Sequence, residues 1–139
     1  MTGGKRARPP SAAQKRALVK RARAVRARAH APYSRFQVGA AVLDEKGRVH
    51  AGINVENASY GLTVCAERHA VAAAVAAGAK RIRAVAVVTP TSPPGSPCGA
   101  CRQVLAEFAP PEAPVLLASP GGAPEETTLG ELLPRSFRL

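Results

Sequence analysis

The segment Ile82-Arg83-Ala84-Val85-Ala86-Val87-Val88 is apolar apart from Arg83 and rich in β-branched residues. This composition is typical of a central strand that is covered on both faces. Such a strand requires a layer of helices on each side of its sheet. The sequence therefore predicts a three-layer α/β domain.

The segments after and before this strand alternate between helix and strand patterns. An alanine-rich segment without Gly or Pro, residues 63–77, precedes it and predicts a helix that ends at Gly78. A Pro-, Gly- and Ser-rich loop follows at residues 90–97, and then a short helix is predicted at 99–108 and a strand at 115–118. Residues 128–133 predict a final helical turn.

The N-terminal part adds one helix and one hairpin. Ser11 is a suitable N-cap for a helix that extends to about residue 29, before Pro32. An apolar run at 36–43 and a second one at 49–55 flank the turn at 45–47, so these two strands predict a β-hairpin. We expect residues 1–10 to form a disordered basic tail and residues 11–139 to form a single domain.

The positive charge is concentrated at the N-terminus. The chain has 20 Lys and Arg against 9 Asp and Glu, and residues 1–43 contain eleven of the basic residues and no acidic one. A solvated helix face with a flexible basic start explains this pattern, and a polyanion-binding arm is the alternative. Without a secretory leader or a membrane-spanning run, the three cysteines predict a soluble, cytoplasmic protein.

All three cysteines fall in two short motifs. Cys65 is followed two residues later by Glu67, and Cys98 and Cys101 form a C-x-x-C pair. Each motif begins a predicted helix, where the helix dipole and unpaired N–H groups stabilise a thiolate. Three thiolate ligands and a non-ligand carboxylate are the inventory of a catalytic zinc site with an open fourth position.

Other roles for these residues are less favoured. His69 could act as a fourth ligand, but it lies one turn deeper in the helix, so we expect it to pack there, like His30 and His50 elsewhere. A closed structural zinc site lacks a fourth cysteine, and a Cys98–Cys101 disulfide leaves Cys65 unexplained. Three thiolates overcompensate Zn²⁺, and Arg68 is the neighbouring cation that can offset the excess charge.

Several motifs together resemble the short, homotetrameric, zinc-dependent cytidine deaminases. The C-A-E segment and the P-C-x-x-C segment match the signature of the zinc deaminases, with Cys in a place that can also hold His. The similarity spans about residues 18–137 and rests on Pro32-Tyr33-Ser34, Phe36-Gln37-Val38-Gly39-Ala40-Ala41, Asn54-Val55-Glu56-Asn57-Ala58-Ser59-Tyr60-Gly61, Cys65-Ala66-Glu67-Arg68 and Ser96-Pro97-Cys98-Gly99-Ala100-Cys101-Arg102-Gln103.

The resemblance implies a fold, a cofactor and a reaction. The fold is an α-β-α sandwich with a central mixed five-stranded sheet, and the cofactor is one zinc ion per chain held by Cys65, Cys98 and Cys101. Zinc-bound hydroxide would attack C4 of free cytidine or deoxycytidine, while Glu67 shuttles a proton to N3 and helps to expel ammonia. The products would be uridine and deoxyuridine, as in pyrimidine salvage.

The resemblance also assigns substrate contacts. Asn54 and Glu56, two residues apart on one strand face, would clamp the ribose 3′-hydroxyl, although on the residues alone they also fit a solvated strand end. Phe36 would pack on the base, although it also fits ordinary core filling. The backbone N–H of Ala66 would meet the pyrimidine O2, and the carbonyl of Ser96 the leaving amino group.

Two aromatic residues are assigned to contacts between subunits. Phe137 resembles the aromatic residue that closes the pocket of a neighbouring subunit, and Tyr60 resembles an interface residue. The resemblance therefore implies that a homotetramer completes each site. The family commonly has Thr where this chain has His69, and the basic N-terminus has no explanation in the family.

Three alternatives remain open. A polynucleotide base editor would use the basic arm, but the Asn54 and Glu56 clamp and the short chain argue against a nucleic-acid channel. A blasticidin-type deaminase would accept a modified cytosine nucleoside. A zinc-stabilised nucleic-acid-binding module would have no catalytic need for Glu67.

Overall fold

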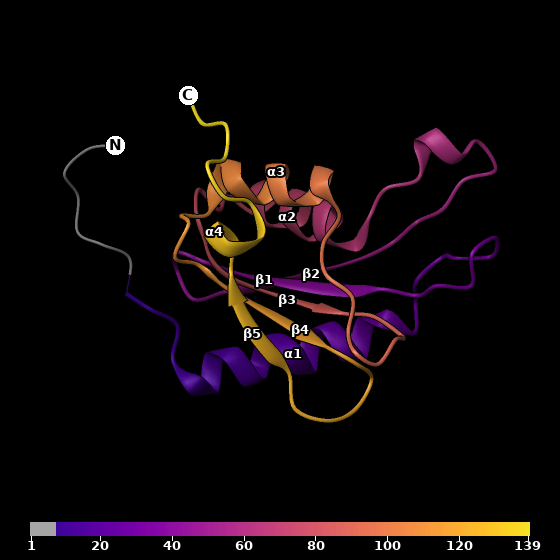
Figure 1. Cartoon of the computed structure of the whole chain (residues 1–139), viewed down its shortest axis with the longest axis horizontal. Coiled ribbons are helices and arrows are strands. Elements are labelled where there is room, and N and C mark those ends of the chain that lie inside the picture. The colour runs from indigo at the N-terminus through magenta and orange to yellow at the C-terminus, as the bar shows by residue number, and fades with distance from the viewer. Residues whose placement is uncertain (1–7) are drawn as a thin grey trace.

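The computed structural model describes residues 8–139, and it forms one mixed sheet with helices on both faces (Figure 1). The strand order is β2-β1-β3-β4-β5, and only β3 and β4 are parallel. This confirms the predicted three-layer α/β class and the mixed five-stranded sheet. The elements are α1 (Ala12–Arg26), β1 (Gly39–Asp44), β2 (Val49–Ile53), the 3₁₀ turn η1 (Tyr60–Leu62), α2 (Ala66–Ala76), β3 (Ile82–Val88), α3 (Gly99–Phe108), β4 (Pro114–Ala118), β5 (Glu125–Thr128) and α4 (Leu129–Leu132).

The core consists of two apolar layers separated by the sheet. α1 covers one face, whereas α2 and α3 cover the other (Figure 1). Alternate residues of the strands point to opposite layers, so Ala40 and Val42 face α2 while Ala41 and Leu43 face α1. β3 supplies both layers and is buried along its length except at Arg83, as predicted for a central strand.

α1 begins where the sequence predicts but ends earlier. Ser11 is the N-cap, and its side chain and that of Gln14 form a reciprocal capping box. The helix ends at Arg26 rather than at about residue 29. The chain after the helix becomes extended, because His30 forms a β-bridge with Val55. In this bridge the N–H of His30 donates to the carbonyl oxygen of Asn54, and the N–H of Glu56 donates to the carbonyl oxygen of His30.

α2 begins three residues later than predicted. Val64 pairs with Val55 through two backbone hydrogen bonds of 3.0 and 3.1 Å, so residues 63–64 are extended rather than helical. Cys65 is therefore the N-cap residue of α2. The helix ends just before Gly78, whose φ of +96° is a conformation that favours glycine, as the sequence predicts.

The C-terminal region contains the fifth strand, which residue patterns alone did not reveal. β5 pairs antiparallel with β4, and α4 follows it at once. Residues 125–128 are Glu-Glu-Thr-Thr, two exposed and two half-buried, so they lack the apolar alternation by which strands are found. The resemblance to a five-stranded family supplied what the pattern did not.

The predicted disordered tail is described only in part. Residues 1–7 lie outside the described residues, whereas the backbone carbonyls of Arg8 and Pro9 accept hydrogen bonds from the guanidinium of Arg83. The division into a tail and a domain stays a prediction. Among residues 8–139, no helix has the length and hydropathy needed to span a bilayer.

Candidate active site

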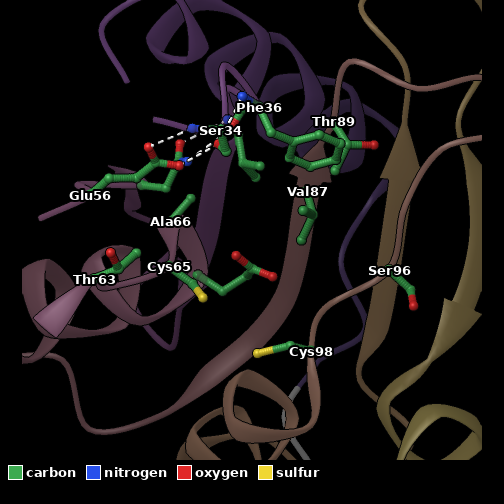
Figure 2. A pocket seen from close by; sticks show the side chains of 13 residues that line it. Ser34, Phe36, Glu56, Thr63, Cys65, Ala66, Val87, Thr89, Ser96 and Cys98 are labelled. Atoms are coloured by element: carbon green, nitrogen blue, oxygen red, sulfur yellow. Dashed lines mark hydrogen bonds between the residues drawn. The ribbon is translucent and has the colours of Figure 1, made fainter. Parts of the chain in front are cut away.

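The three cysteines meet at the facing N-termini of two helices. Cys65 is the N-cap residue of α2, Cys98 is the N-cap residue of α3, and Cys101 lies in the first turn of α3. Their three sulfur atoms lie within 4.8 Å of one another, and those of Cys98 and Cys101 are 3.4 Å apart. Figure 2 shows the sulfur atoms of Cys65 and Cys98 at the same end of the pocket. The two sequence motifs thus form one cluster.

The surroundings of the cluster favour the thiolate form of Cys65. All three cysteines are free. A hydrogen bond from the Cys101 thiol, together with the neighbouring Arg68 guanidinium, lowers the pKa of Cys65 to about 5 despite its partial burial. The pKa of the Cys101 thiol is raised in turn, because it donates to Cys65 and is buried. Cys65 is therefore more readily ionised than Cys101, and a bound cation would offset the charge of additional thiolates.

Arg68 provides part of that offset. Its Nη2 lies 4.0 Å from the sulfur of Cys65 and 3.3 Å from the carbonyl oxygen of Thr63. Its Nε is buried without a hydrogen-bond partner among the described residues. The pKa of Arg68 is raised by the hydrogen bond to Cys65. An orphaned donor beside three converging sulfurs fits an anionic metal–thiolate cluster, so the residues present fit a zinc ion with three sulfur ligands.

Glu67 lies next to the cysteines and is almost fully buried. It belongs to the first turn of α2 and only 5% of its surface is exposed. Burial raises the pKa of Glu67 to about 7, and the charge of Cys65 adds to the shift. A carboxyl group in this range can both accept and donate a proton near neutral pH, which is what general acid–base catalysis requires.

Cys65, Glu67 and Cys98 line a cavity of about 540 Å³, within the size range of small-molecule sites. The cavity lies where β3 ends and where α2 and α3 begin. Its lining includes all the predicted site residues except Tyr60, Arg68, Cys101 and Phe137. The lining residues are Ser34, Phe36, Val38, Asn54, Glu56, Thr63, Cys65, Ala66, Glu67, Val87, Thr89, Ser96 and Cys98.

Asn54 and Glu56 both face the cavity, but each is already engaged within the chain. The Asn54 side chain accepts from the N–H of Val38 at 2.9 Å and donates to the carbonyl of Phe36 at 2.8 Å. It is buried, with an exposed fraction of 8%. Its amide can still make one further donor and one further acceptor contact. Asn54 thus shapes the cavity wall while retaining the capacity to bind a hydroxyl group.

Glu56 is held by the turn that follows α1. Its Oε1 accepts from the backbone N–H groups of Tyr33 and Ser34 at 3.0 and 3.1 Å, and its Oε2 accepts from the Ser34 hydroxyl (Figure 2). The hydrogen bond from Ser34 is the largest cause of a lowered pKa for Glu56. Glu56 therefore remains an anion with free lone pairs on Oε2 that can accept from a hydroxyl.

The aromatic residues divide into two groups. Phe36 lines the cavity, as do Val87 and Thr89 (Figure 2). Tyr60 and Phe137 do not line it and are 72% and 71% exposed. The Tyr60 ring lies 5.9 Å from that of Tyr33, in the loop region that projects beyond the sheet (Figure 1). Tyr60 and Phe137 each leave a large aromatic ring open to solvent.

His69 packs away from the sulfur atoms, as expected. Its Nδ1 lies 2.8 Å from the carbonyl oxygen of Ile53 and donates to it, so this ring ties α2 to the end of β2. The metal-ligating cluster found within residues 8–139 consists of the three cysteines alone. His50 instead pairs with the buried carboxylate of Asp44 at 2.8 Å.

Sequence interpretation missed several residues of the cavity wall. Val87 lies near the end of β3 and Thr89 directly follows that strand, and the carboxyl ends of central strands commonly form binding sites. Thr89 also accepts from the N–H of Gly95 at 2.7 Å, which ties the loop before Ser96 to the sheet. Ser34 belongs to the Pro32-Tyr33-Ser34 motif, but its contact with Glu56 depends on a turn that the sequence does not specify.

Comparisons with known proteins agree with this geometry. A family model described as the cytidine and deoxycytidylate deaminase zinc-binding region matches residues 12–117. A cytidine deaminase from Halalkalibacterium halodurans is 52% identical over 120 residues, which cover 86% of this chain and 91% of that protein. A cytidine deaminase from Mycobacterium tuberculosis is 49% identical over 111 residues, or 80% of each chain. The crystal structure of a cytidine deaminase from Burkholderia pseudomallei aligns with a TM-score of 0.83 at 49% identity, covering 88% of this chain and 98% of that one.

Proposed function

This chain belongs to the family of cytidine and deoxycytidylate deaminases, and on that premise we propose that it hydrolyses free cytidine and deoxycytidine to uridine and deoxyuridine. The C4–N bond of the base breaks, a C4–O bond forms, and the amino group leaves as ammonia. The observation that carries the proposal is the position of Glu67, buried in the cavity wall beside three sulfur atoms that lie within 4.8 Å of one another.

One zinc ion per chain would be held by the three cysteines. When bound, zinc supplies a Lewis acid that lowers the pKa of a water molecule enough to make it a nucleophile at neutral pH. Arg68 offsets part of the negative charge of the three thiolates, because its guanidinium already lies beside Cys65. The closed structural site and the Cys98–Cys101 disulfide are not favoured, because the three free thiols converge beside an open cavity.

Glu67 would carry the proton through the reaction. Its carboxylate accepts a proton from the attacking water and delivers it to N3 of the pyrimidine. It then takes the remaining proton of the former water from the hydroxyl group on C4 and delivers it to the amino group, so that the C4–N bond breaks, the C4 carbonyl forms and ammonia leaves. A pKa near 7 suits both directions of transfer, since neither protonation state of the carboxyl group is strongly preferred at neutral pH.

The cavity wall would bind the nucleoside around these groups. Phe36 packs against the base, the N–H of Ala66 donates to the pyrimidine O2, and the carbonyl of Ser96 accepts from the leaving amino group. Asn54 and Glu56 hold the ribose 3′-hydroxyl with the donor and acceptor capacity that their internal hydrogen bonds leave free. This clamp favours a free nucleoside, because a polynucleotide carries a phosphate on that hydroxyl.

A homotetramer would complete each site. Phe137 would close the cavity of a neighbouring subunit and Tyr60 would lie in an interface, and the high exposure of both side chains supports this assignment. We place the reaction in pyrimidine salvage in the cytoplasm, where free thiols persist. Light scattering at micromolar concentration tests the assembly, and a monomer with full activity would contradict the shared site.

The decisive experiment compares the wild type with Glu67→Gln, which keeps the size of the side chain but removes its proton chemistry. We expect the ultraviolet change of cytidine deamination with the wild type, and a loss of turnover of at least about 10²-fold in the variant with one zinc ion per chain retained. Glu107→Gln, on the exposed side of α3, is the matched control and should keep full turnover.

The outcomes separate the competing functions. Zinc-loaded wild type without turnover of cytidine would refute the proposal. Turnover of a cytosine-containing oligonucleotide but not of cytidine would indicate a polynucleotide base editor instead. Nucleic-acid binding that is fully retained in Glu67→Gln, without turnover of cytidine by the wild type, would indicate a zinc-stabilised binding module.

A further inference from the structure

Arg102 makes a three-point contact to which the sequence motifs assign no role. Its Nε donates to the carbonyl oxygen of Pro97 at 2.7 Å, and its Nη2 donates to the hydroxyl of Ser96 at 2.8 Å. Its Nη1 donates to the carbonyl oxygen of Leu132 at 2.6 Å. All three nitrogen atoms of the guanidinium are thus engaged, two with the loop before α3 and one with the end of α4.

The loop that Arg102 contacts forms one wall of the cavity. Ser96 and Cys98 line the cavity, and Pro97 between them is buried. Arg102 lies one helical turn after Cys98, and its own backbone N–H donates to the carbonyl of Cys98 at 3.0 Å. The backbone and the side chain of a single residue therefore bind three consecutive residues of this wall.

The opposite side of the contact is the C-terminal segment. Leu132 is the last residue of α4, and the chain after it runs along α3. Gln103 donates to the carbonyl oxygen of Phe137 at 3.0 Å, and Arg138 donates to those of Ala106 and Ala109 at 2.8 and 3.1 Å. α3 thus connects the cavity loop at its N-terminus with the segment that presents Phe137.

We propose that Arg102 is a positioning residue that fixes the Ser96–Pro97 wall against the end of α4, so that the Ser96 carbonyl meets the leaving amino group at the right distance. The inference rests on the proposed function, which assigns that contact to Ser96. It extends that function to a residue that touches neither substrate nor metal ligand side chain.

The chemistry of the contact requires arginine in particular. The three acceptors lie on two separate segments, and a planar guanidinium presents its donors in a fixed fork that can reach both. A lysine ammonium is a single point of charge on a flexible stem, so it can satisfy one segment at a time. Lysine at this position keeps the charge but loses the bridge.

The test measures kcat, KM and zinc content of Arg102→Gln and Arg102→Lys with cytidine. We expect kcat to fall about 10- to 100-fold in both variants, as for other residues that orient an active-site group, while one zinc ion per chain remains. KM should change less than kcat, because the Ser96 contact gains strength as the amino group leaves.

A third variant separates positioning from folding. Arg102→Ala leaves a gap of the shape of the lost guanidinium, so added millimolar guanidinium should restore part of its kcat. Arg23→Gln is the matched control, since Arg23 also donates to two loop carbonyls, Ser119 and Gly122, but on the face of the sheet covered by α1. It should lower stability and leave kcat unchanged, with no response to guanidinium.

Three results would overturn the inference. The first is a kcat of Arg102→Gln within twofold of the wild type. The second is a loss of activity that follows the loss of zinc, which would make Arg102 a support for the metal ligands. The third is equal loss of kcat in Arg23→Gln, which would indicate a general effect of stability. A wild type without cytidine turnover would refute the proposed function itself, and is thereby distinguishable from all three.

Discussion

Replacing Gly52 with alanine tests how the sheet sets the geometry of the active site. A Cβ at Gly52 of β2 would lie 2.3 Å from the backbone nitrogen of Ala70 and 2.5 Å from the carbonyl oxygen of Ala66. Both atoms belong to the backbone of α2, so no change of a side-chain rotamer relieves the clash. The helix that carries Cys65 and Glu67 at its N-terminus must move instead.

The structure gives the size of that movement. A carbon contact needs about 3.5 Å, so α2 must recede from β2 by about 1 Å. Overpacking of this kind costs about 1–3 kcal/mol of folding free energy. A displacement of about 1 Å between catalytic groups lowers turnover on the order of 10²-fold, and here it separates Cys65 and Glu67 from the cysteine pair of α3.

The assay combines kcat/KM for cytidine, zinc affinity against a competing chelator, and thermal unfolding. Gly52→Ala should fold with reduced stability, bind zinc more weakly and turn over cytidine about 10²-fold more slowly. Gly121→Ala is the control, because a Cβ there meets no atom of the described residues within 4 Å. A folded Gly52→Ala protein with unchanged zinc affinity and turnover would refute the idea that this helix–sheet contact sets the site.

Two further predictions concern regions away from the cavity. Burial alone would raise the pKa of Asp44, but hydrogen bonds from His50, Arg48 and Lys46 lower it from 3.8 to about 2. The ionised carboxylate therefore contributes about 2 kcal/mol to the free energy of unfolding. This contribution is complete above about pH 4 and is lost as the pH falls towards about 2. Urea unfolding should therefore show Asp44→Asn to be less stable than the wild type at pH 6, with the difference shrinking at pH 2.5, and a constant difference would contradict this. Removal of residues 1–7 should leave kcat and KM for cytidine unchanged, since among residues 8–139 the lining of the active-site cavity begins at Ser34. A sharply raised KM would instead give the basic arm a role in substrate capture.

The sequence predicted the elements with strong local signals most accurately. β3 and α3 have the predicted bounds, and Ser11 caps α1. The signal for each is encoded by residues close together in sequence: an apolar run for β3, the start of a helix at the C-x-x-C motif for α3, and a capping box for α1. The start of α2 was predicted three residues too early, because the pairing of Val64 with Val55 is a contact between residues that are not adjacent in sequence. β5 escaped detection for a similar reason, since its pairing with β4 and not its own polar composition makes it a strand.

The same distinction applies to the site. Cys65, Glu67, Cys98 and Cys101 were found because their chemistry is evident in their spacing. The internal partners of Asn54 and Glu56 were not, since a carboxylate in an extended segment does not reveal that the turn containing Ser34 already binds it. Which residues could react was predictable from side-chain chemistry, whereas which residues hold them in place depended on backbone geometry.

The two halves of the site are positioned by different means, and neither of these involves the sulfur atoms. α2 packs closely on β2 because Gly52 has no side chain, and the hydrogen bond from His69 to the carbonyl oxygen of Ile53 holds the two elements together. α3 and its preceding loop are held through Arg102, which binds Ser96, Pro97 and Leu132. Both supports are contacts of the chain with itself, and the three sulfur atoms that they bring together lie within 4.8 Å of one another. A disturbance on the α2 side should therefore weaken zinc binding and proton transfer together, whereas one at Arg102 should spare the zinc and slow the departure of the amino group.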